Sequence, residues 1–167
     1  GPPTLPSMPL ADGVAGVTGA FAVMLALYHR DANGGSGQVI DIALTESLLT
    51  LMEPSLLEWD QLGTDLRRTG NSLSHVAPRT AYQCADGEWV ALSASSQSIF
   101  VRLAHAIGRP EMLDDPRFRS NADRVLNIEA LDAIIGGWMV SHTRSETLRK
   151  MDDEEVAVGP IYDLPSV

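Results

Sequence analysis

The sequence predicts a helix-rich chain of mixed α/β class that contains one β-hairpin. Residues 13–28 are free of charge and carry regularly spaced glycines, a pattern that indicates a long helix. Two strand-like runs flank Asp86 and Gly87, a pair that favours a tight type I′ hairpin turn. Beyond residue 95, apolar residues recur at helical spacing behind serine, asparagine and threonine caps, so helices are predicted there.

Composition limits the classes of partner. The chain has 167 residues, of which 44% are hydrophobic, enough for one domain or two small lobes. Its net charge is −10, from 12 basic and 22 acidic residues, and no basic stripe is present. Nucleic-acid binding therefore lacks its usual electrostatic footprint, and anionic lipid headgroups repel such a surface. We expect neither nucleic acid nor a membrane as partner; arginines far outnumber lysine, which suggests a GC-rich bacterial genome.

The first helix is predicted from Asp12 to His29. Its charge-free core is shorter than the roughly 18–20 residues that cross a bilayer, so a buried helix is expected rather than a membrane span. Gly13, Gly16 and Gly19 recur every three residues and form a face that another backbone could approach closely. Each internal glycine costs up to about 1 kcal/mol relative to alanine, so tight packing is expected to compensate.

A glycine-rich loop, residues 34–37, follows this helix. A phosphate cradle needs the order strand, glycines, helix, because the helix N-terminus then faces the anion. Here the order is helix, glycines, strand, and an anion would meet the negative helix end. We interpret the loop as a C-cap that leads into a short strand at 38–44, followed by a helix from Glu46 to Leu62 with Thr45 as N-cap.

The second half of the chain begins with the predicted hairpin, residues 79–93. Three helices are predicted behind it, over residues 96–107, 128–142 and 144–152. The last of them has a capping-box pattern between Thr143 and Glu146. A strand and a turn are predicted at the end of the chain.

Neither a disulfide nor a metal site is predicted. Cys84 is the single cysteine, which excludes a disulfide within the chain and fits a cytoplasmic protein. The four histidines lie at least 30 residues apart, and no HxxH or CxxC spacing occurs.

An ordered set of short motifs resembles the family III CoA-transferases, the CaiB/BaiF group. The stretch from Pro9 to Leu44 contains that family's P-x-x-D, glycine-spaced helix, A-L-x-x-R and G-x-G-Q patterns, with Ile40 in its V-D-x-x-L strand motif. Later blocks match in order and spacing: RRTGN, then YQCADGEWVALSASSQSIFVRLAHAIGRPEMLDDPRFRSNADRVLN, then VAVGPIYDL. Each motif alone is weak, but the set covers essentially the whole chain.

The resemblance implies a piece of a larger, two-domain subunit. A large doubly wound domain binds coenzyme A, a small α+β domain starts with the hairpin, and two subunits interlock as a homodimer. On this basis the chain divides into part of the large domain with a linker helix (1–62), a loop or linker (63–78), the small domain (79–155) and a return toward the large domain (156–167).

The resemblance also implies a reaction. Members transfer CoA between carboxylates through an active-site aspartate, which forms a mixed anhydride and then an enzyme–CoA thioester. That aspartate precedes the PLAD block and is expected upstream of residue 1, so Asp12 is interpreted as a helix cap or a core carboxylate. We therefore expect coenzyme A and acyl-CoA as substrates, no metal, and no activity from this chain alone.

The loop at 63–78 carries the best candidate residues. The positions that match the family's mobile glycine-rich loop include Asn71, Ser72, Ser74 and His75, and the glycine run itself is absent. These side chains could hydrogen-bond a thioester or a carboxylate, and imidazoles suit acid–base work. A solvated interdomain linker is the alternative interpretation.

Three further residues are candidates for contact with substrate or CoA. Gln97 could contact substrate, although helix capping by Ser95 or Ser96 explains the same segment. Arg67 and Arg68 could bind an acyl carboxylate or a CoA phosphate, or form a surface or interchain salt bridge.

Three functions remain open at this point. CoA transfer is the first, and residues 94–118 resemble the transferases more closely than they resemble the racemases of the same fold. The 2-methylacyl-CoA racemase branch of the same fold is the second. A non-catalytic dimerisation fragment is the third.

Overall fold

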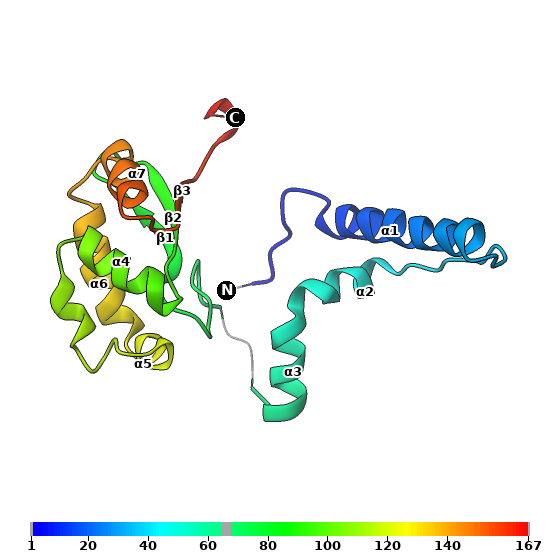
Figure 1. Cartoon of the computed structure of the whole chain (residues 1–167), viewed down its shortest axis with the longest axis horizontal. Coiled ribbons are helices and arrows are strands. Elements are labelled where there is room, and N and C mark those ends of the chain that lie inside the picture. Colours follow the sequence, from blue (N-terminus) through cyan, green and yellow to red (C-terminus); the bar gives the residue numbers. More distant parts are fainter. Residues whose placement is uncertain (1, 65–67, 167) are drawn as a thin grey trace. The chain divides into compact units, whose positions relative to one another are not determined.

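The computed structural model describes residues 2–64 and 68–166, and it divides the chain into two compact units, Gly1–Arg67 and Arg68–Val167. All described regular structure in the first unit is helical, whereas the second unit combines a small sheet with helices (Figure 1). The chain is thus helix-rich and of α/β type, with a three-stranded antiparallel sheet.

Four helical segments make up the first unit: α1 (Leu10–Ala32), α2 (Leu44–Leu49), the 3-10 turn η1 (Thr50–Met52) and α3 (Glu53–Leu62). The predicted glycine ending of α1 is confirmed. The N–H groups of Asn33 and Gly35 both donate to the carbonyl of His29, at 3.3 and 3.1 Å. Gly34 has a φ of +66°, in the left-handed region that favours glycine.

The strand predicted at 38–44 is wrong. Residues 33–43 contain no helix or strand, and α2 already begins at Leu44 with Ala43 as N-cap, so Thr45 is not the cap. A strand needs a neighbour for its backbone N–H and C=O groups, and the described part of this unit offers no other extended segment for pairing. The β-branched run alone was therefore an insufficient signal.

α1 is more exposed than predicted. Only Ala15 is buried, whereas Phe21 and Met24 are each 65% exposed. Close approach occurs at just one of the three spaced glycines, because a Cβ at Gly19 would lie 3.1 Å from Ile42 Cδ1 while Gly13 and Gly16 have no neighbour within 4 Å. Within the described residues, α1 therefore lacks the packing that would make it a core helix.

Length and hydropathy would also allow α1 to cross a bilayer. It has 23 residues, and an 18-residue window has a mean hydropathy of 1.8. Core helices of larger proteins share these properties, so they do not distinguish the two environments.

The second unit is built on the strands β1 (Arg79–Gln83), β2 (Trp89–Ser93) and β3 (Val158–Pro160), in the order β1-β2-β3. Arg79 pairs with Ser93 and Ala81 with Ala91, and Ala91 pairs in turn with Gly159. The helices are α4 (Gln97–Ala106), α5 (Asn121–Leu126), α6 (Ile128–Met139) and α7 (Arg144–Asp153), with 3-10 turns η2 (Pro110–Leu113) and η3 (Leu164–Ser166).

The core of this unit lies between one face of the sheet and helices α4, α6 and α7 (Figure 1). Strand alternation directs Tyr82, Val90 and Leu92 toward it. α6 contributes a stripe at a spacing of four residues, and the large apolar side chains that helices bury fully are Phe100, Leu103, Leu131, Ile135, Met139 and Met151. The spacing of apolar residues along each strand and helix therefore decides which of its faces is buried.

The hairpin is confirmed, but its turn differs from the predicted type. A type I′ turn needs positive φ at both central residues, and here only Gly87 has it, at +82°. The N–H of Gly87 donates to the Cys84 carbonyl at 3.0 Å, and the N–H of Cys84 to Glu88 at 2.8 Å, as in a three-residue loop with a glycine bulge. Asp86 does not need a positive φ in this turn. Its carboxylate accepts a hydrogen bond from the N–H of Arg144 at 3.0 Å.

Candidate functional site

A shallow groove lies on the outer face of the hairpin, opposite the core. It has a volume of 500 Å³, and its lining residues are Asn71, Leu73, Arg79, Thr80, Ala81, Ala91, Leu92 and Ser93. Paired Ala81 and Ala91 leave the floor open because their side chains are small. The groove therefore joins the sequence-predicted loop to the sheet within one unit of the chain.

Local hydrogen bonds fold the loop that precedes β1. The Thr69 hydroxyl donates to the Ser72 carbonyl at 2.5 Å, and the Ser72 N–H donates to the Thr69 carbonyl at 3.3 Å. Leu73 and Val76 form an isolated antiparallel bridge. These contacts turn the backbone tightly, so that Ser74 and His75 lie exposed at the tip of the turn.

Asn121 holds this loop from the side. Its Nδ2 donates to the His75 carbonyl at 2.9 Å, and its Oδ1 accepts from the Ala77 N–H at 3.0 Å. One amide thus pairs with a backbone acceptor and a backbone donor two residues apart, which fixes residues 75–77 relative to α5.

Arg124, on the next turn of α5, joins three chain segments. Its side chain is 1% exposed, and its guanidinium donates to the carbonyls of Ala77 (2.9 Å), Phe118 (3.1 Å) and Ser95 (2.8 Å). The guanidinium also lies 4.3 Å from the ring centroid of Phe100, a cation–π contact. Burial lowers the pKa of Arg124 from its ordinary value, and the carbonyl dipoles take the place of water around the charge.

Gln97, the first residue of α4, is the fourth partner of that guanidinium. Its Oε1 accepts from Arg124 Nη1 at 2.9 Å, and its side chain is exposed. α4 itself begins at Ser96, whose Oγ accepts from the Ile99 N–H at 3.4 Å, so the capping alternative for this segment is also real. Gln97 is thereby available for a role other than capping.

Two predicted segments thus meet at α5. Asn71, Ser72, Ser74 and His75 belong to the folded loop, Gln97 belongs to α4, and Asn121 and Arg124 tie the two together. Among the described residues, the side chains of Asn71, Ser74 and His75 make no hydrogen bond. Arg68 is exposed at the start of the second unit, whereas Arg67 lies outside the described residues.

Sequence reasoning missed Asn121 and Arg124 because it missed α5. No helix was predicted between residues 107 and 128, yet Ser120 and Asp123 form a complete capping box. Asp123 accepts from the Ser120 N–H at 3.1 Å and the Ser120 hydroxyl at 2.6 Å. That serine-to-acid spacing was the signal that could have predicted the helix.

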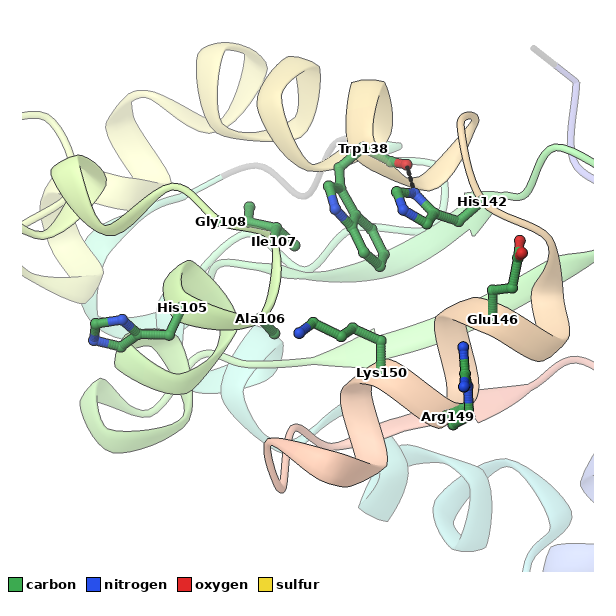
Figure 2. A pocket seen from close by; sticks show the side chains of 9 residues that line it. All are labelled: His105, Ala106, Ile107, Gly108, Trp138, His142, Glu146, Arg149 and Lys150. Carbon is green, nitrogen blue, oxygen red and sulfur yellow. Dashed lines mark hydrogen bonds between the residues drawn. The ribbon is translucent and has the colours of Figure 1, made fainter.

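A second cleft, of 410 Å³, lies where the ends of α4 and α6 meet α7 (Figure 2). Trp138 stacks on His142 with ring centroids 4.0 Å apart, and His142 Nδ1 must be the donor to the Trp138 carbonyl at 2.9 Å, since a carbonyl only accepts. Lys150 reaches from α7 toward Ala106, whereas His105 points away from the other side chains (Figure 2).

The polarity of this second cleft is mixed. Arg149 and Lys150 donate no hydrogen bond to any described residue, so both could attract an anion. Two helix C-termini with partial negative charge meet at the same place and offset that attraction. The stronger candidate is therefore the hairpin groove together with Asn121 and Arg124, which we call the α5 clasp.

The groove and its surroundings offer hydrogen-bond donors and acceptors rather than a metal centre. Within residues 2–64 and 68–166, no group of three or more His, Cys, Asp or Glu side chains could hold a metal ion. Cys84 is buried behind the sheet, where burial raises the pKa of its thiol and keeps it protonated. The arrangement can offer hydrogen bonds to a polar ligand.

Comparison with known proteins identifies the family of this chain. Residues 1–167 match CoA-transferase family III, and the chain belongs to that family. It is 38% identical over 161 residues to the succinyl-CoA–D-citramalate CoA-transferase of Chloroflexus aurantiacus, covering 96% of this chain and 40% of that protein. It is 31% identical to the acetyl-CoA:oxalate CoA-transferase of Acetobacter aceti, covering 98% of this chain and 42% of that protein.

Solved structures show the same fold. A CAIB/BAIF family protein from Brucella suis superimposes with a TM-score of 0.70 at 27% identity, over 99% of this chain and 43% of that one. The Mycobacterium tuberculosis protein Rv3272 gives a TM-score of 0.81 at 24% identity, over 99% and 43%, a likeness of fold. The chain thus spans about two fifths of the length of the relatives that it matches.

Proposed function

We propose that this chain is part of an enzyme that transfers CoA from an acyl-CoA thioester to a carboxylic acid. The observation that carries the proposal is the family match over residues 1–167, together with 38% identity to a succinyl-CoA-dependent transferase. The first unit would belong to the doubly wound, CoA-binding domain, and the second unit, from β1 to β3, would be the small domain. The complete protein would be a cytoplasmic homodimer.

The catalytic aspartate would lie in the part of the family's length that this chain does not match. Its carboxylate would attack the thioester carbonyl and expel CoA thiolate, giving a mixed anhydride. CoA thiolate would then attack the aspartyl carbonyl, releasing the first acid and leaving an enzyme–CoA thioester, from which the second acid takes CoA by the reverse steps. This chain's own contribution would be orientation: Asn71, Ser74, His75 and Gln97 would present hydrogen bonds to the acyl group, and Arg68 would attract its charge.

A short dicarboxylic acid is the acid substrate that we propose. Curated relatives from Chloroflexus aurantiacus carry the names succinyl-CoA–D-citramalate and succinyl-CoA–L-malate CoA-transferase, at 38% and 30–32% identity to this chain. A Haloarcula hispanica relative at 28% identity is named succinyl-CoA:mesaconate CoA-transferase. These names share succinyl-CoA as donor and an acid with two carboxylates as acceptor.

The test uses the complete gene product, with the 167-residue chain alone as its comparison. Incubation with succinyl-CoA and a panel of dicarboxylates is expected to yield new acyl-CoA esters by mass spectrometry, and the chain alone is expected to yield none. Hydroxylamine added during turnover should inactivate the complete enzyme by trapping the acylated aspartate.

Two other outcomes would contradict the proposal. Unchanged activity in hydroxylamine would rule out the anhydride mechanism. Deuterium incorporation at C2 of a 2-methylacyl-CoA in D2O, without any transfer of CoA, would assign the protein to the racemase branch instead.

A further inference from the structure

Arg124 determines which end of the Gln97 amide faces solvent. A guanidinium carries only N–H donors, so the Gln97 atom 2.9 Å from Arg124 Nη1 must be the oxygen. The Gln97 NH2 group is then directed elsewhere, on a side chain that is exposed at the first position of α4. The orientation of the Gln97 amide is therefore fixed, because only its oxygen can accept a hydrogen bond from the Arg124 guanidinium.

The guanidinium itself has little freedom to turn. It is fully enclosed, and three of its bonds go to the backbone carbonyls of Ala77, Phe118 and Ser95, which belong to three separate segments of the chain. All of its described hydrogen-bond acceptors are neutral, so no described carboxylate competes with the Gln97 oxygen for the charge.

The same guanidinium also fixes the candidate loop. Ala77 follows His75 by two residues, and both accept or donate hydrogen bonds on the α5 clasp formed by Asn121 and Arg124. A displacement of Arg124 would therefore move the loop and the Gln97 amide together. The positions of the Asn71–His75 loop and of the Gln97 amide are therefore coupled through Arg124.

We propose that Arg124 is a positioning residue that holds the Gln97 NH2 outward as a hydrogen-bond donor for an acyl oxygen of the substrate, while keeping the Asn71–His75 loop in register with it. This inference rests on the proposed CoA-transfer function. Thioester carbonyls and carboxylates only accept hydrogen bonds, so a donor is the polarity that they require. The positive end of the α4 dipole favours the same developing negative charge.

The first experiment measures the anchoring without any activity. In the 15N-labelled 167-residue chain, the Gln97 side-chain NH2 is expected to show a heteronuclear NOE near that of the backbone, well above that of exposed Gln38. Arg124→Lys keeps the charge but loses the planar fork, so it should lower the Gln97 value to that of Gln38. A Gln97 NH2 as mobile as Gln38 in the wild-type chain would overturn the inference.

The second experiment separates the donor from the anchor in the complete enzyme. Gln97→Glu keeps an oxygen for Arg124 but replaces the outward NH2 with an acceptor, so kcat/KM for acyl-CoA should fall at least tenfold while the thermal midpoint does not decrease. Gln83→Glu makes the same change on the exposed edge of β1 and should stay within twofold of wild type. This comparison remains decisive even if Arg124→Lys does not fold.

The outcomes distinguish the inference from the proposed function. An active wild-type enzyme whose Gln97→Glu and Gln83→Glu variants have equal kcat/KM would overturn the positioning role and leave CoA transfer intact. A complete wild-type enzyme that transfers no CoA would overturn the proposed function, and with it the assignment of an acyl oxygen as the acceptor. A Gln97→Glu variant whose thermal midpoint falls together with its kcat/KM would indicate a purely structural role for Gln97, which also contradicts the inference.

Discussion

Individual residues in this chain show how burial and hydrogen bonding change side-chain chemistry. Tyr82 is 6% exposed, and its hydroxyl donates to Asp132 Oδ1 at 2.5 Å across the core edge. Burial raises the pKa of Tyr82 far above its ordinary value, and the hydrogen bond to Asp132 raises it further. Burial also raises the pKa of Asp132, while the Tyr82 hydroxyl lowers it. The tyrosine therefore partly compensates for the buried carboxylate.

Replacing Tyr82 with phenylalanine is expected to lower the free energy of unfolding by about 1–2 kcal/mol at pH 7. The hydroxyl favours the ionised carboxylate, so its removal raises the pKa of Asp132 further. The difference between wild type and variant should therefore be larger at pH 7 than below the Asp132 pKa, where the carboxyl is protonated. Urea unfolding at pH 7 and pH 3 measures it, and Tyr162→Phe, at an exposed tyrosine, is the control.

Sequence reasoning at this scale found exposed candidates but not their supports. The Asn71–His75 loop could be proposed because it carries polar groups in a segment without periodicity, and Gln97 because it lies at the junction between the hairpin and the next helix. Arg124 could not, because an arginine in a polar run is ordinarily solvated, and only the fold encloses it with three backbone carbonyls.

The helix starts at Ser96 and Thr143 were predictable at the scale of elements. Thr143 and Glu146 form the predicted capping box: the Thr143 N–H donates to Glu146 Oε2 at 2.9 Å, and the Glu146 N–H donates to Thr143 Oγ1 at 3.3 Å. These bonds depend on residues three apart and on nothing distant. The strand expected at 38–44 failed for the opposite reason, since a strand depends on a partner that local sequence does not specify.

Replacing Thr143 with alanine should lower the free energy of unfolding by about 1 kcal/mol, because the first turn of α7 loses a side-chain acceptor for its N–H groups. Ser145→Ala, in the same turn and exposed, should change it by less than about 0.5 kcal/mol. Urea denaturation followed by tryptophan fluorescence measures both. Equal effects of the two substitutions would contradict the capping role of Thr143.

The whole molecule divides its stability unequally between its two units. Among the described residues, the first unit buries only Ala15 and Ser47, whereas the continuous core belongs to the second unit. The sequence predicted the hairpin of the second unit, but not the exposure of α1, because a glycine-rich apolar sequence is equally compatible with a buried helix and with an exposed one.

Hydrogen exchange should reveal this asymmetry. In the 167-residue chain, amides of β1, β2, α4 and α6 are expected to be strongly protected, and those of α1 to exchange at least tenfold faster than α6. Exchange monitored by mass spectrometry on peptic peptides measures both in one sample. Protection of α1 equal to that of α6 would show that the first unit has a stable core of its own.

The alternation along β1 and β2 has a consequence for divergence within the family. The side chains that stabilise the second unit, such as Tyr82 and Val90, lie on one face, while Ala81 and Ala91 form the groove floor on the other. Mutations can therefore enlarge or reshape that floor without passing through the core. Evolution can vary the shape of the groove at these positions while selection for folding acts on their neighbours, so groove shape and stability can drift independently.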